Sequence, residues 1–238
     1  MLNIDELYEL ASGRRTIRGF RKDKDVPEEY IRRILDVARW APSGGNGQPW
    51  EFVVIRDSEK REWIAELFRK QQGPKLEMEK AMGRASRASG AGFRNAPVFI
   101  LVLGDPRVKE CYPVRTREEK DFQHLITGLA SAGLLIQLAA ASLGLGSQYV
   151  SDASSAYMSI MLKTYLGIPD NLKVYELIPI GYPVKPAPVP PRRSVDEIVH
   201  YERYDMKRAR TDQDVKDFLM SNTRLGGYGR KEEGREHI

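Results

Sequence analysis

Segments with the apolar spacing of helices occur along most of the chain. In Leu2–Ala11, and again between Pro27 and Pro42, apolar side chains recur every three or four residues, which predicts helices that bury one face. Gly13 is expected to end the first of these helices. The sequence predicts three further helices, at Glu59–Lys70, Phe122–Leu143 and Ala153–Leu166.

Short apolar runs bounded by glycine, proline or polar residues predict strands between these helices. The clearest is Pro97–Leu103, which is continuously apolar and is therefore expected to be a buried strand. Three further strands are predicted at Phe52–Ile55, Leu145–Val150 and Tyr175–Gly181. Because helices and strands intermingle without regular βαβ alternation, the pattern predicts an α+β fold rather than a doubly wound sheet.

The Phe122–Leu143 segment has the most distinctive composition of the predicted helices. It is apolar around most of its circumference and rich in alanine, glycine and serine. A helix of this kind is expected to be buried on all sides. In a chain of this size it would be a central helix, and it is suited to packing against its own copy across a two-fold axis.

The overall composition is that of a soluble globular protein. Of the 238 residues, 41% are hydrophobic and 30% are charged, as in one large domain or two small ones. No uninterrupted apolar run reaches the roughly 18–20 residues of a membrane span, and the acidic Met1–Leu10 does not have the pattern of a signal peptide. Cys111 is the one cysteine, so no intrachain disulfide can form. We therefore expect a cytoplasmic protein without a membrane segment.

The charge of the chain is moderately basic, with a formal net charge of +5 and a pI of about 9.2. Basic and acidic residues are mixed in most segments, which is typical of a solvated surface and does not favour nucleic-acid binding. A basic module that binds nucleic acid stays open as an alternative, and it would show strongly salt-dependent DNA binding.

Several common catalytic motifs are missing from the sequence. It contains neither the P-loop pattern nor G-x-G-x-x-G; the glycine pair at Gly144 and Gly146 fails because Tyr149 occupies the sixth position. There is no G-x-S-x-G elbow. The three histidines and Cys111 lack metal-ligand spacing, so no metal site is predicted. An enzyme of this sequence would need an organic cofactor to supply its chemistry.

The first candidate binding segment is the basic stretch Arg14-Arg15-Thr16-Ile17-Arg18. Guanidinium groups bind phosphate through paired charge-assisted hydrogen bonds, and a threonine hydroxyl adds a neutral one. In an extended segment alternate residues face the same way, so Arg14, Thr16 and Arg18 can contact one ligand. The alternative interpretation is a solvated basic turn.

The second candidate is the glycine-rich loop Pro42–Trp50. Its glycines allow the backbone to approach a planar ligand closely. Ser43, Asn46 and Gln48 carry polar groups suited to hydroxyls or ring carbonyls. An ordinary connection between a helix and a strand would explain the same residues.

Two weaker candidates lie later in the chain. Tyr149, Val150 and Ser151 follow a tight glycine turn at the end of a predicted strand, where backbone amides can bind a flavin ring. Arg192 and Arg193 follow the proline-rich stretch Pro183–Pro191, which restricts where they can lie. The alternatives are a core strand and a basic tail.

Together and in this order, these segments resemble the nitroreductase family from about Leu7 to about Tyr204. The two most specific parts are residues 14–20, Arg-Arg-Thr-Ile-Arg-Gly-Phe, and residues 41–50, Ala-Pro-Ser-Gly-Gly-Asn-Gly-Gln-Pro-Trp. Leu143-Gly144-Leu145-Gly146 and the segment Ile178–Pro183 match less specifically.

The resemblance implies a three-layer α+β fold with a central mixed sheet flanked by helices, in an intertwined homodimer with two FMN sites at the interface. It assigns the phosphate to Arg14, Arg18, Arg192 and Arg193, and it places the glycine-rich loop against the partner's flavin. The backbone amide of Ser151 would face the reactive N5 atom. The expected FMN-contacting residues are Arg14, Arg15, Thr16, Arg18, Pro42, Ser43, Gly44, Asn46, Gln48, Tyr149, Val150, Ser151, Arg192 and Arg193.

The resemblance also implies a reaction. NAD(P)H would deliver a hydride to FMN and leave, and a small electron-poor substrate (a nitroaromatic, a quinone or an activated alkene) would then take it up in a ping-pong cycle. The protein contributes orientation, stacking and positive charge. No side chain is assigned as catalytic, because the cofactor supplies the chemistry.

The chain departs from the classical bacterial nitroreductases at the predicted strand end. Where they carry Pro-x-Glu-Gly, this chain has Tyr149-Val150-Ser151-Asp152. A hydroxyl near N5 is a feature of the related dehalogenases of iodinated tyrosines, so a reductive dehalogenase of halogenated phenols is the alternative. A flavin-fragmenting branch of the family is a third possibility that no feature of this chain demands.

The resemblance also gives a domain organisation. Residues 1–205 would form the FMN-binding domain, with a possible lid at residues 73–95. The polar and charged composition of residues 206–238 predicts a C-terminal extension that is partly disordered or wraps the partner subunit. Its apolar anchor is expected in a short helix at Phe218, Leu219 and Met220, and Gly226–Ile238 is expected to be disordered.

Overall fold

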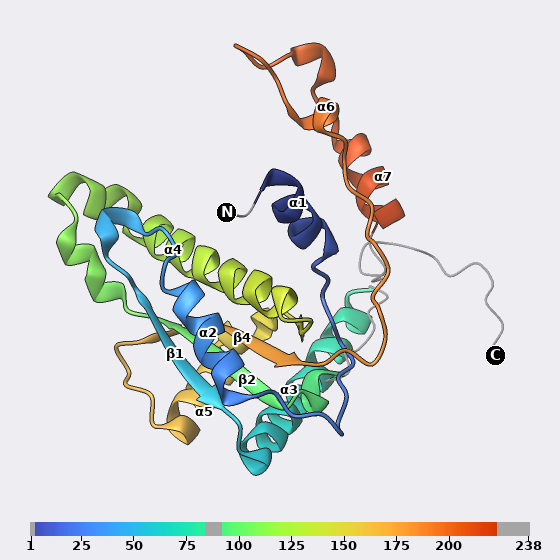
Figure 1. Cartoon of the computed structure of the whole chain (residues 1–238). Helices are drawn as coiled ribbons and strands as arrows, with labels where there is room; N and C mark the ends of the chain where they lie inside the picture. Colours follow the sequence, from blue (N-terminus) through green and yellow to red (C-terminus); the bar gives the residue numbers. More distant parts are fainter. Residues whose placement is uncertain (1–2, 84–91, 223–238) are drawn as a thin grey trace. The chain divides into compact units, whose positions relative to one another are not determined.

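The computed structural model describes residues 3–83 and 92–222. Contacts divide the chain into two compact units, which are described separately: residues 1–71 with 90–187, and residues 72–89 with 188–238 (Figure 1). The predicted boundary at residue 205 stays a prediction. So does the predicted lid, because residues 84–91 lie outside the described residues.

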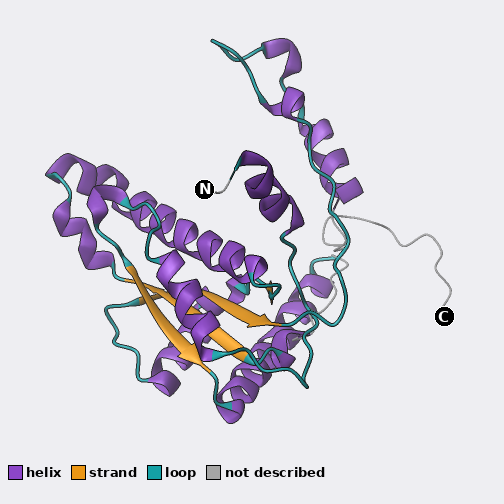
Figure 2. Cartoon of the chain, in the orientation of Figure 1, coloured by secondary structure: helices purple, strands orange, loops and turns teal. Residues whose placement is uncertain are grey.

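A four-stranded sheet forms the centre of the first unit (Figure 2). Its strands lie in the order β1 (Trp50–Ile55), β2 (Val98–Gly104), β4 (Lys173–Gly181) and β3 (Gly146–Ser147), and each neighbouring pair is antiparallel. The named strands of this sheet are thus antiparallel where a mixed sheet was expected, and a parallel pairing occurs in the isolated bridge between Thr16 and Ser147. Every residue of β2 is buried, as its continuous apolar run predicts.

The two faces of the sheet carry separate hydrophobic cores. Because side chains alternate along a strand, Val98, Ile100 and Val102 pack with helices α2 (Glu28–Ala38) and α4 (Val114–Ser142). Phe99, Leu101 and Leu103 pack on the opposite face. That face is covered by α5 (Ala156–Leu166) and the first part of α3 (Ser58–Ala81). The α+β fold and its three layers are thereby confirmed.

Helix α4 has a different environment from the one its sequence predicts. It is buried along the line that includes Leu125, Ala132 and Ile136, but Phe122 is 71% exposed and Leu134 is 50% exposed. The prediction that this helix is buried on all sides is therefore wrong for a single chain. An apolar stripe of α4 is left at the surface.

Helix α4 is also long and apolar enough to cross a membrane by length and composition, with a mean hydropathy of 1.7 in the window tested. The core helix of a protein outside the membrane meets the same criteria, and 44% of the window is buried within the protein. Polar residues such as Thr127 and Ser131 interrupt the apolar run. A search for uninterrupted apolar residues therefore did not identify α4 as long and apolar enough to span a membrane. The absence of a membrane segment stays a prediction.

Other element boundaries differ from the predicted ones for local reasons. Helix α1 (Ile4–Gly13) begins later than expected, because Asn3 caps it and forms a capping box with Glu6. Helix α3 continues through Pro74 to Ala81. Strand β3 is shorter than the predicted Leu145–Val150, since the chain turns into a 3-10 helix at Ser151–Ser154. The remaining 3-10 helices are Gly44–Asn46, Gly92–Asn95, Pro106–Cys111 and Met206–Arg208.

The second unit contains two helices of the C-terminal part of the chain. Helix α6 (Val195–Ile198) starts at Ser194, which forms a capping box with Glu197. Helix α7 (Asp212–Asn222) includes the apolar anchor, so the predicted short helix is confirmed. The predicted disorder of residues 226–238 lies outside the described residues.

Candidate cofactor site

The basic segment Arg14–Arg18 is held in an extended conformation against the edge of the sheet. It leaves α1 at Gly13, and Thr16 forms the parallel bridge with Ser147. The Ile17 backbone N–H donates to the Ser147 carbonyl oxygen at 2.9 Å. The segment is therefore extended as the alternation argument requires, and it is fixed next to β3 rather than being a solvated turn.

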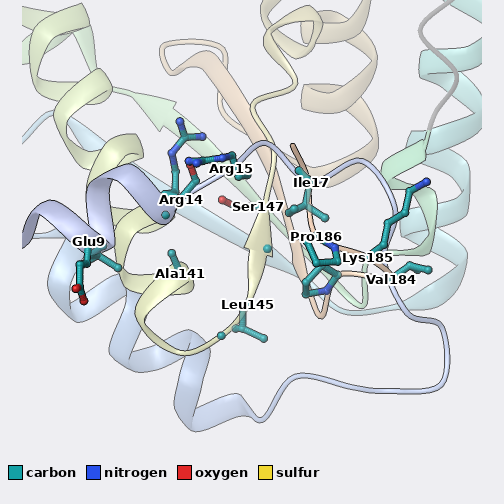
Figure 3. A pocket seen from close by; sticks show the side chains of 16 residues that line it. Glu9, Arg14, Arg15, Ile17, Ala141, Leu145, Ser147, Val184, Lys185 and Pro186 are labelled. Atoms are coloured by element: carbon teal, nitrogen blue, oxygen red, sulfur yellow. The ribbon is translucent and has the colours of Figure 1, made fainter. Parts of the chain in front are cut away.

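A pocket of about 550 Å³ lies beside this segment (Figure 3). It is bounded by the end of α1, the end of α4 with the turn that follows, and the chain beyond β4. Figure 3 shows Arg14 and Arg15 on one side of the pocket and Lys185 on the other. The lining residues are Glu9, Leu10, Gly13, Arg14, Arg15, Ile17, Ala141, Gly144, Leu145, Gly146, Ser147, Pro183, Val184, Lys185, Pro186 and Ala187.

The contacts of Arg15 distinguish it from Arg14. Through Nη1, Arg15 donates to the carbonyl oxygens of Ser12 and Arg14, and so satisfies backbone acceptors at the end of α1. Arg14 lies close enough to Tyr149 to lower the pKa of that phenol slightly. Arg14 thus interacts electrostatically with the strand-end segment, while Arg15 has a structural role at the end of α1.

Close packing explains why a glycine follows the turn at this edge. A methyl group placed on Gly146 would lie 2.5 Å from Ile17 Cγ1 and 2.8 Å from Ile17 Cβ. These separations are below any normal contact, so a larger residue at position 146 would push the basic segment away from β3. Gly146 therefore sets how closely Arg14 and its neighbours approach the strand.

The glycine-rich loop adopts a locally strained backbone. Gly45, Asn46 and Gln48 all have positive φ angles, of 56°, 52° and 46°, and this region is costly for residues other than glycine. The Gln48 N–H donates to Ser43 Oγ at 3.0 Å. A methyl group on Gly44 would lie 2.9 Å from the His124 ring, so the loop is packed closely on α4.

This loop does not line the pocket beside Arg14 and Arg15. Pro42, Asn46 and Gln48 are exposed, and Ser43 and Gly44 are partly exposed. Within one chain, the structure therefore does not bring the second predicted segment together with the first. Their expected relation, in which the loop contacts the partner's cofactor, stays a prediction.

The strand-end segment packs against α4 and β4. The Val150 N–H donates to the Leu177 carbonyl oxygen at 2.9 Å. A methyl group on Gly133 would lie 2.6 Å from the Tyr149 hydroxyl oxygen, so this hydroxyl lies directly on α4. Burial, and then the nearby Tyr175, raise the pKa of Tyr149 to about 12. Tyr149 is therefore a neutral phenol at physiological pH.

Glu176, on β4, was not singled out from the sequence and is the most unusual residue near this segment. It is 5% exposed, and burial raises its pKa to about 8, while the Val150 backbone N–H acts in the opposite direction. The available signal was a glutamate inside the apolar run Tyr175–Gly181. A glutamate there must either lie at the surface or be buried with partners.

The second basic pair lies in the other unit, whose placement relative to the pocket is not determined. Arg192 Nη1 donates to the Pro191 carbonyl oxygen at 3.1 Å, and Arg193 Nη2 donates to the Glu197 carbonyl oxygen at 2.6 Å. The role of this pair in binding phosphate stays a prediction. Within residues 3–83 and 92–222, no cluster of metal-ligating side chains occurs.

The residues beside the pocket fit a phosphate-bearing cofactor such as FMN. Each guanidinium carries five N–H donors, so Arg15 keeps donors beyond those of the one nitrogen that contacts the backbone. Ser147 supplies a hydroxyl at the same wall. Pockets for small molecules have volumes of about 300–1,000 Å³, which includes the volume found here. Lys185 adds a third cation that the sequence did not indicate as a binding residue.

Comparison with known proteins gives a consistent result. The family model described as "Nitroreductase family" matches residues 11–182. A protein of Archaeoglobus fulgidus, whose name proposes an NADH dehydrogenase or NAD(P)H nitroreductase, is 30% identical over 76% of this chain and 87% of its own length. Iodotyrosine deiodinase 1 of Rattus norvegicus is 28% identical over 83% of this chain and 70% of its own length.

Solved structures agree with the sequence relatives. The FMN-dependent nitroreductase of Clostridium difficile R20291 superposes with a TM-score of 0.61 at 25% identity, over 83% of this chain and 99% of that one. NfrA2 of B. megaterium superposes with a TM-score of 0.68 at 18% identity, over 90% of this chain and 80% of that one, and supports the fold alone. With the family model matching most of its length, this chain belongs to the nitroreductase family.

Proposed function

We propose that the protein is an FMN-dependent oxidoreductase that passes a hydride from NAD(P)H to a small electron-poor substrate by a ping-pong mechanism. Membership of the nitroreductase family makes an oxidoreductase the expected class of enzyme. The observation that carries the proposal is the extended Arg14–Arg18 segment, held on the edge of β3 beside a pocket of about 550 Å³. Nitroaromatics, quinones and activated alkenes are the proposed substrates.

The binding roles follow the charge and position of each group. Arg14 and Arg18, with Arg192 and Arg193, are proposed to bind the phosphate, because guanidinium donors match phosphate oxygens. Arg15 and Thr16 would lie near the phosphate, the ribityl chain or the ring. FMN, when bound, would supply the hydride chemistry.

The strand-end segment is proposed to orient the ring of the cofactor. Val150 is fixed by its hydrogen bond to Leu177, and the chain then enters a 3-10 helix at Ser151–Ser154. A backbone restrained in this way can present amides to ring atoms without reorganisation during turnover. The Ser151 backbone amide would face N5, as the family match suggests.

A homodimer is proposed to complete the site. The residues of α4 at four-residue spacing from Phe122 to Leu138 form an apolar ridge, of which Phe122 is 71% and Leu134 is 50% exposed. A ridge of this spacing is suited to packing against another helix. A second copy would cover this ridge and would bring its glycine-rich loop to the cofactor.

The other proposed partners are small molecules, namely NAD(P)H and the substrate. The proposed reaction needs no nucleic acid, membrane or metal, and a cytoplasmic location is proposed.

The dimer is testable with one substitution at the surface of a single chain. We expect Leu134→Lys to shift the protein from dimer to monomer in analytical ultracentrifugation and to weaken FMN binding. Thr164→Lys, at an exposed position of α5 rather than α4, is the control. A wild-type protein that sediments as a monomer at every concentration would contradict the dimer.

A reductive dehalogenase is the second candidate, and Ser151 favours it. This hydroxyl stands where the classical nitroreductases have glutamate, and iodotyrosine deiodinase 1 is among the relatives. The test is turnover of iodinated phenols by protein reduced with dithionite. A complete lack of halide release would exclude this candidate.

The experiment for the proposed function is an absorption spectrum, followed by anaerobic addition of NADH or NADPH. We expect a yellow protein whose long-wavelength bands bleach with one or both coenzymes. A protein that stays colourless after incubation with FMN would overturn the proposal. Bands that neither coenzyme bleaches would overturn the NAD(P)H step and leave the dehalogenase as the candidate.

A further inference from the structure

A group of polar side chains is buried between β4, α4 and the strand-end segment, behind the surface that the cofactor is proposed to contact. Glu176 is 5% exposed and Gln137, on α4, is 2% exposed. Glu176 lies in register with Val102, on the sheet face that packs against α2 and α4. The Tyr149 hydroxyl, which interacts with Gln137, reaches the same helix.

The hydrogen-bonding capacity of this group is incompletely used. Among the described residues, Glu176 Oε1 and Gln137 Oε1 are buried oxygens without a hydrogen-bond donor. Two acceptors without donors cost free energy in a buried site. A proton on Glu176 turns one acceptor into a donor and removes the charge, so the surroundings favour the neutral acid.

Glu176 is directly connected to the strand-end segment. The Val150 N–H, which donates to the Leu177 carbonyl oxygen, is close enough to the Glu176 carboxyl to lower its pKa, and Asp152 is close enough to raise it. Glu176 also raises the pKa of Tyr149. A charge placed at this segment would therefore interact with the Glu176 carboxyl, and burial strengthens that interaction.

We propose that Glu176 is the proton-holding residue of the cofactor site, taking up a proton as negative charge arrives at the Tyr149–Ser151 segment and releasing it as that charge leaves. The proposal rests on the proposed function, because it is FMN that would bring the charge. Glu176 does not contact the substrate. It acts through the Val150 backbone, which makes it a positioning residue.

The charge balance of the step is simple. A hydride from NAD(P)H would bring two electrons and one proton, so NAD(P)H would leave as NAD(P)⁺ and the site, with FMN bound, would gain one negative charge. Above its pKa of about 8, where Glu176 is ionised before the cofactor is reduced, it would take the compensating proton from solvent and become neutral. When the substrate accepts the hydride, the charge leaves the site and the proton returns to solvent or follows to the product.

The titratable groups around Glu176 do not replace it in this role. Tyr175 on its own strand has a pKa raised by burial, and Tyr149, from the neighbouring segment, has one raised to about 12. Asp152 raises the pKa of Glu176, Arg14 lowers the pKa of Tyr149, and Gln137 on α4 does not titrate. With its pKa of about 8, Glu176 is the member of this group that changes charge near physiological pH.

The experiment measures proton uptake during anaerobic reduction of the FMN-loaded protein, with an indicator dye in weak buffer, at pH values below and above 8. We expect wild type to take up more protons per cofactor than Glu176→Gln above pH 8, by up to one proton, and the same number at low pH. Glu51→Gln, an exposed glutamate of the same sheet, is the control and should match wild type. Glu176→Asp should restore part of the difference.

A second readout does not need the cofactor. The infrared spectrum of the apoprotein at neutral pH should contain a carbonyl band of a protonated carboxylic acid that Glu176→Gln removes and Glu51→Gln keeps.

Equal proton uptake by wild type and Glu176→Gln at every pH would overturn the proposal, even if FMN binds and is reduced. If the infrared band is present but FMN never binds, the proposed function fails and the coupling fails with it. If Glu176→Gln does not fold, a pH-independent proton uptake by wild type alone overturns the proposal.

Discussion

Arg14 and Glu176 both interact electrostatically with Tyr149, but their surroundings favour opposite charge states. Arg14 is partly exposed at the wall of an open pocket, where a guanidinium keeps its hydration until an anion replaces the water. Glu176 is 5% exposed, and its surroundings favour the neutral form. In the proposed function, the exposed arginine would bind the anionic end of the cofactor, and the buried acid would respond to the charge that the cofactor gains.

The largest expected effect is the change with pH in the free energy of unfolding that buried Glu176 causes. Burial raises the pKa of Glu176 from 4.5 to about 8, so the folded protein binds the proton more tightly than the unfolded chain does. Stability should therefore fall as pH rises from 4.5 toward 8, by at most about 1.4 kcal/mol per pH unit. Glu176→Gln should escape this loss, so its stability relative to wild type should rise through the same window. Urea unfolding of the apoprotein at several pH values measures it.

Glu51→Gln is the matched control for this measurement, because Glu51 is exposed on β1. Its stability should follow wild type at every pH. A constant difference between Glu176→Gln and wild type across the window would show that Glu176 has an ordinary pKa, and the contrast between the two ends of the site would disappear.

The next effect concerns the exposed end. Arg14→Ala should weaken FMN binding by roughly 10- to 150-fold, the equivalent of about 1.5–3 kcal/mol for a hydrogen bond to a charged group, with little change in unfolding. Fluorescence titration of the apoprotein with FMN measures it. Arg21→Ala removes an exposed arginine paired with Asp23 and is the control. If both variants bind FMN as wild type does, the phosphate is bound elsewhere.

The smallest effect tests the contact that holds the basic segment on β3. Gly146→Ala places a methyl group 2.5 Å from Ile17 Cγ1 and should destabilise the protein by about 1–3 kcal/mol through overpacking. Ile17→Ala in the same chain should recover part of this loss, because it removes Cγ1, at 2.5 Å, and Cγ2, at 3.0 Å, while Cβ stays. The double-mutant cycle is measured by urea unfolding. A purely additive cycle would mean that the basic segment is not held by this contact.

Most elements of the fold could be predicted from the sequence, because helical and strand spacing are local properties of the chain. The continuous apolar run of β2 and the helix that follows Pro27 are examples. Boundaries were predicted less well where tertiary contacts decided them. Strand β3 ends at Ser147 because the chain turns to pack Val150 on β4, which no local pattern encodes.

The candidate site shows the same division. The arginines of residues 14–18 and the glycines of the loop at residues 42–50 are visible in the sequence, because phosphate binding and close backbone approach require particular residue types. Glu176 was missed. A glutamate within an apolar strand indicates a buried acid only when the elements that cover it are known.

Residue types and their spacing were enough to predict the α+β class, the basic segment and the glycine-rich loop. They were also enough to recognise the resemblance to the nitroreductase family. Three contacts became visible in the folded chain. Ile17 packs on Gly146, and the Tyr149 hydroxyl lies on Gly133. Glu176 lies on the sheet face that packs against α4. The physical reason is that the free energy of a polar group depends on what surrounds it. Those surroundings come from residues far apart in the chain.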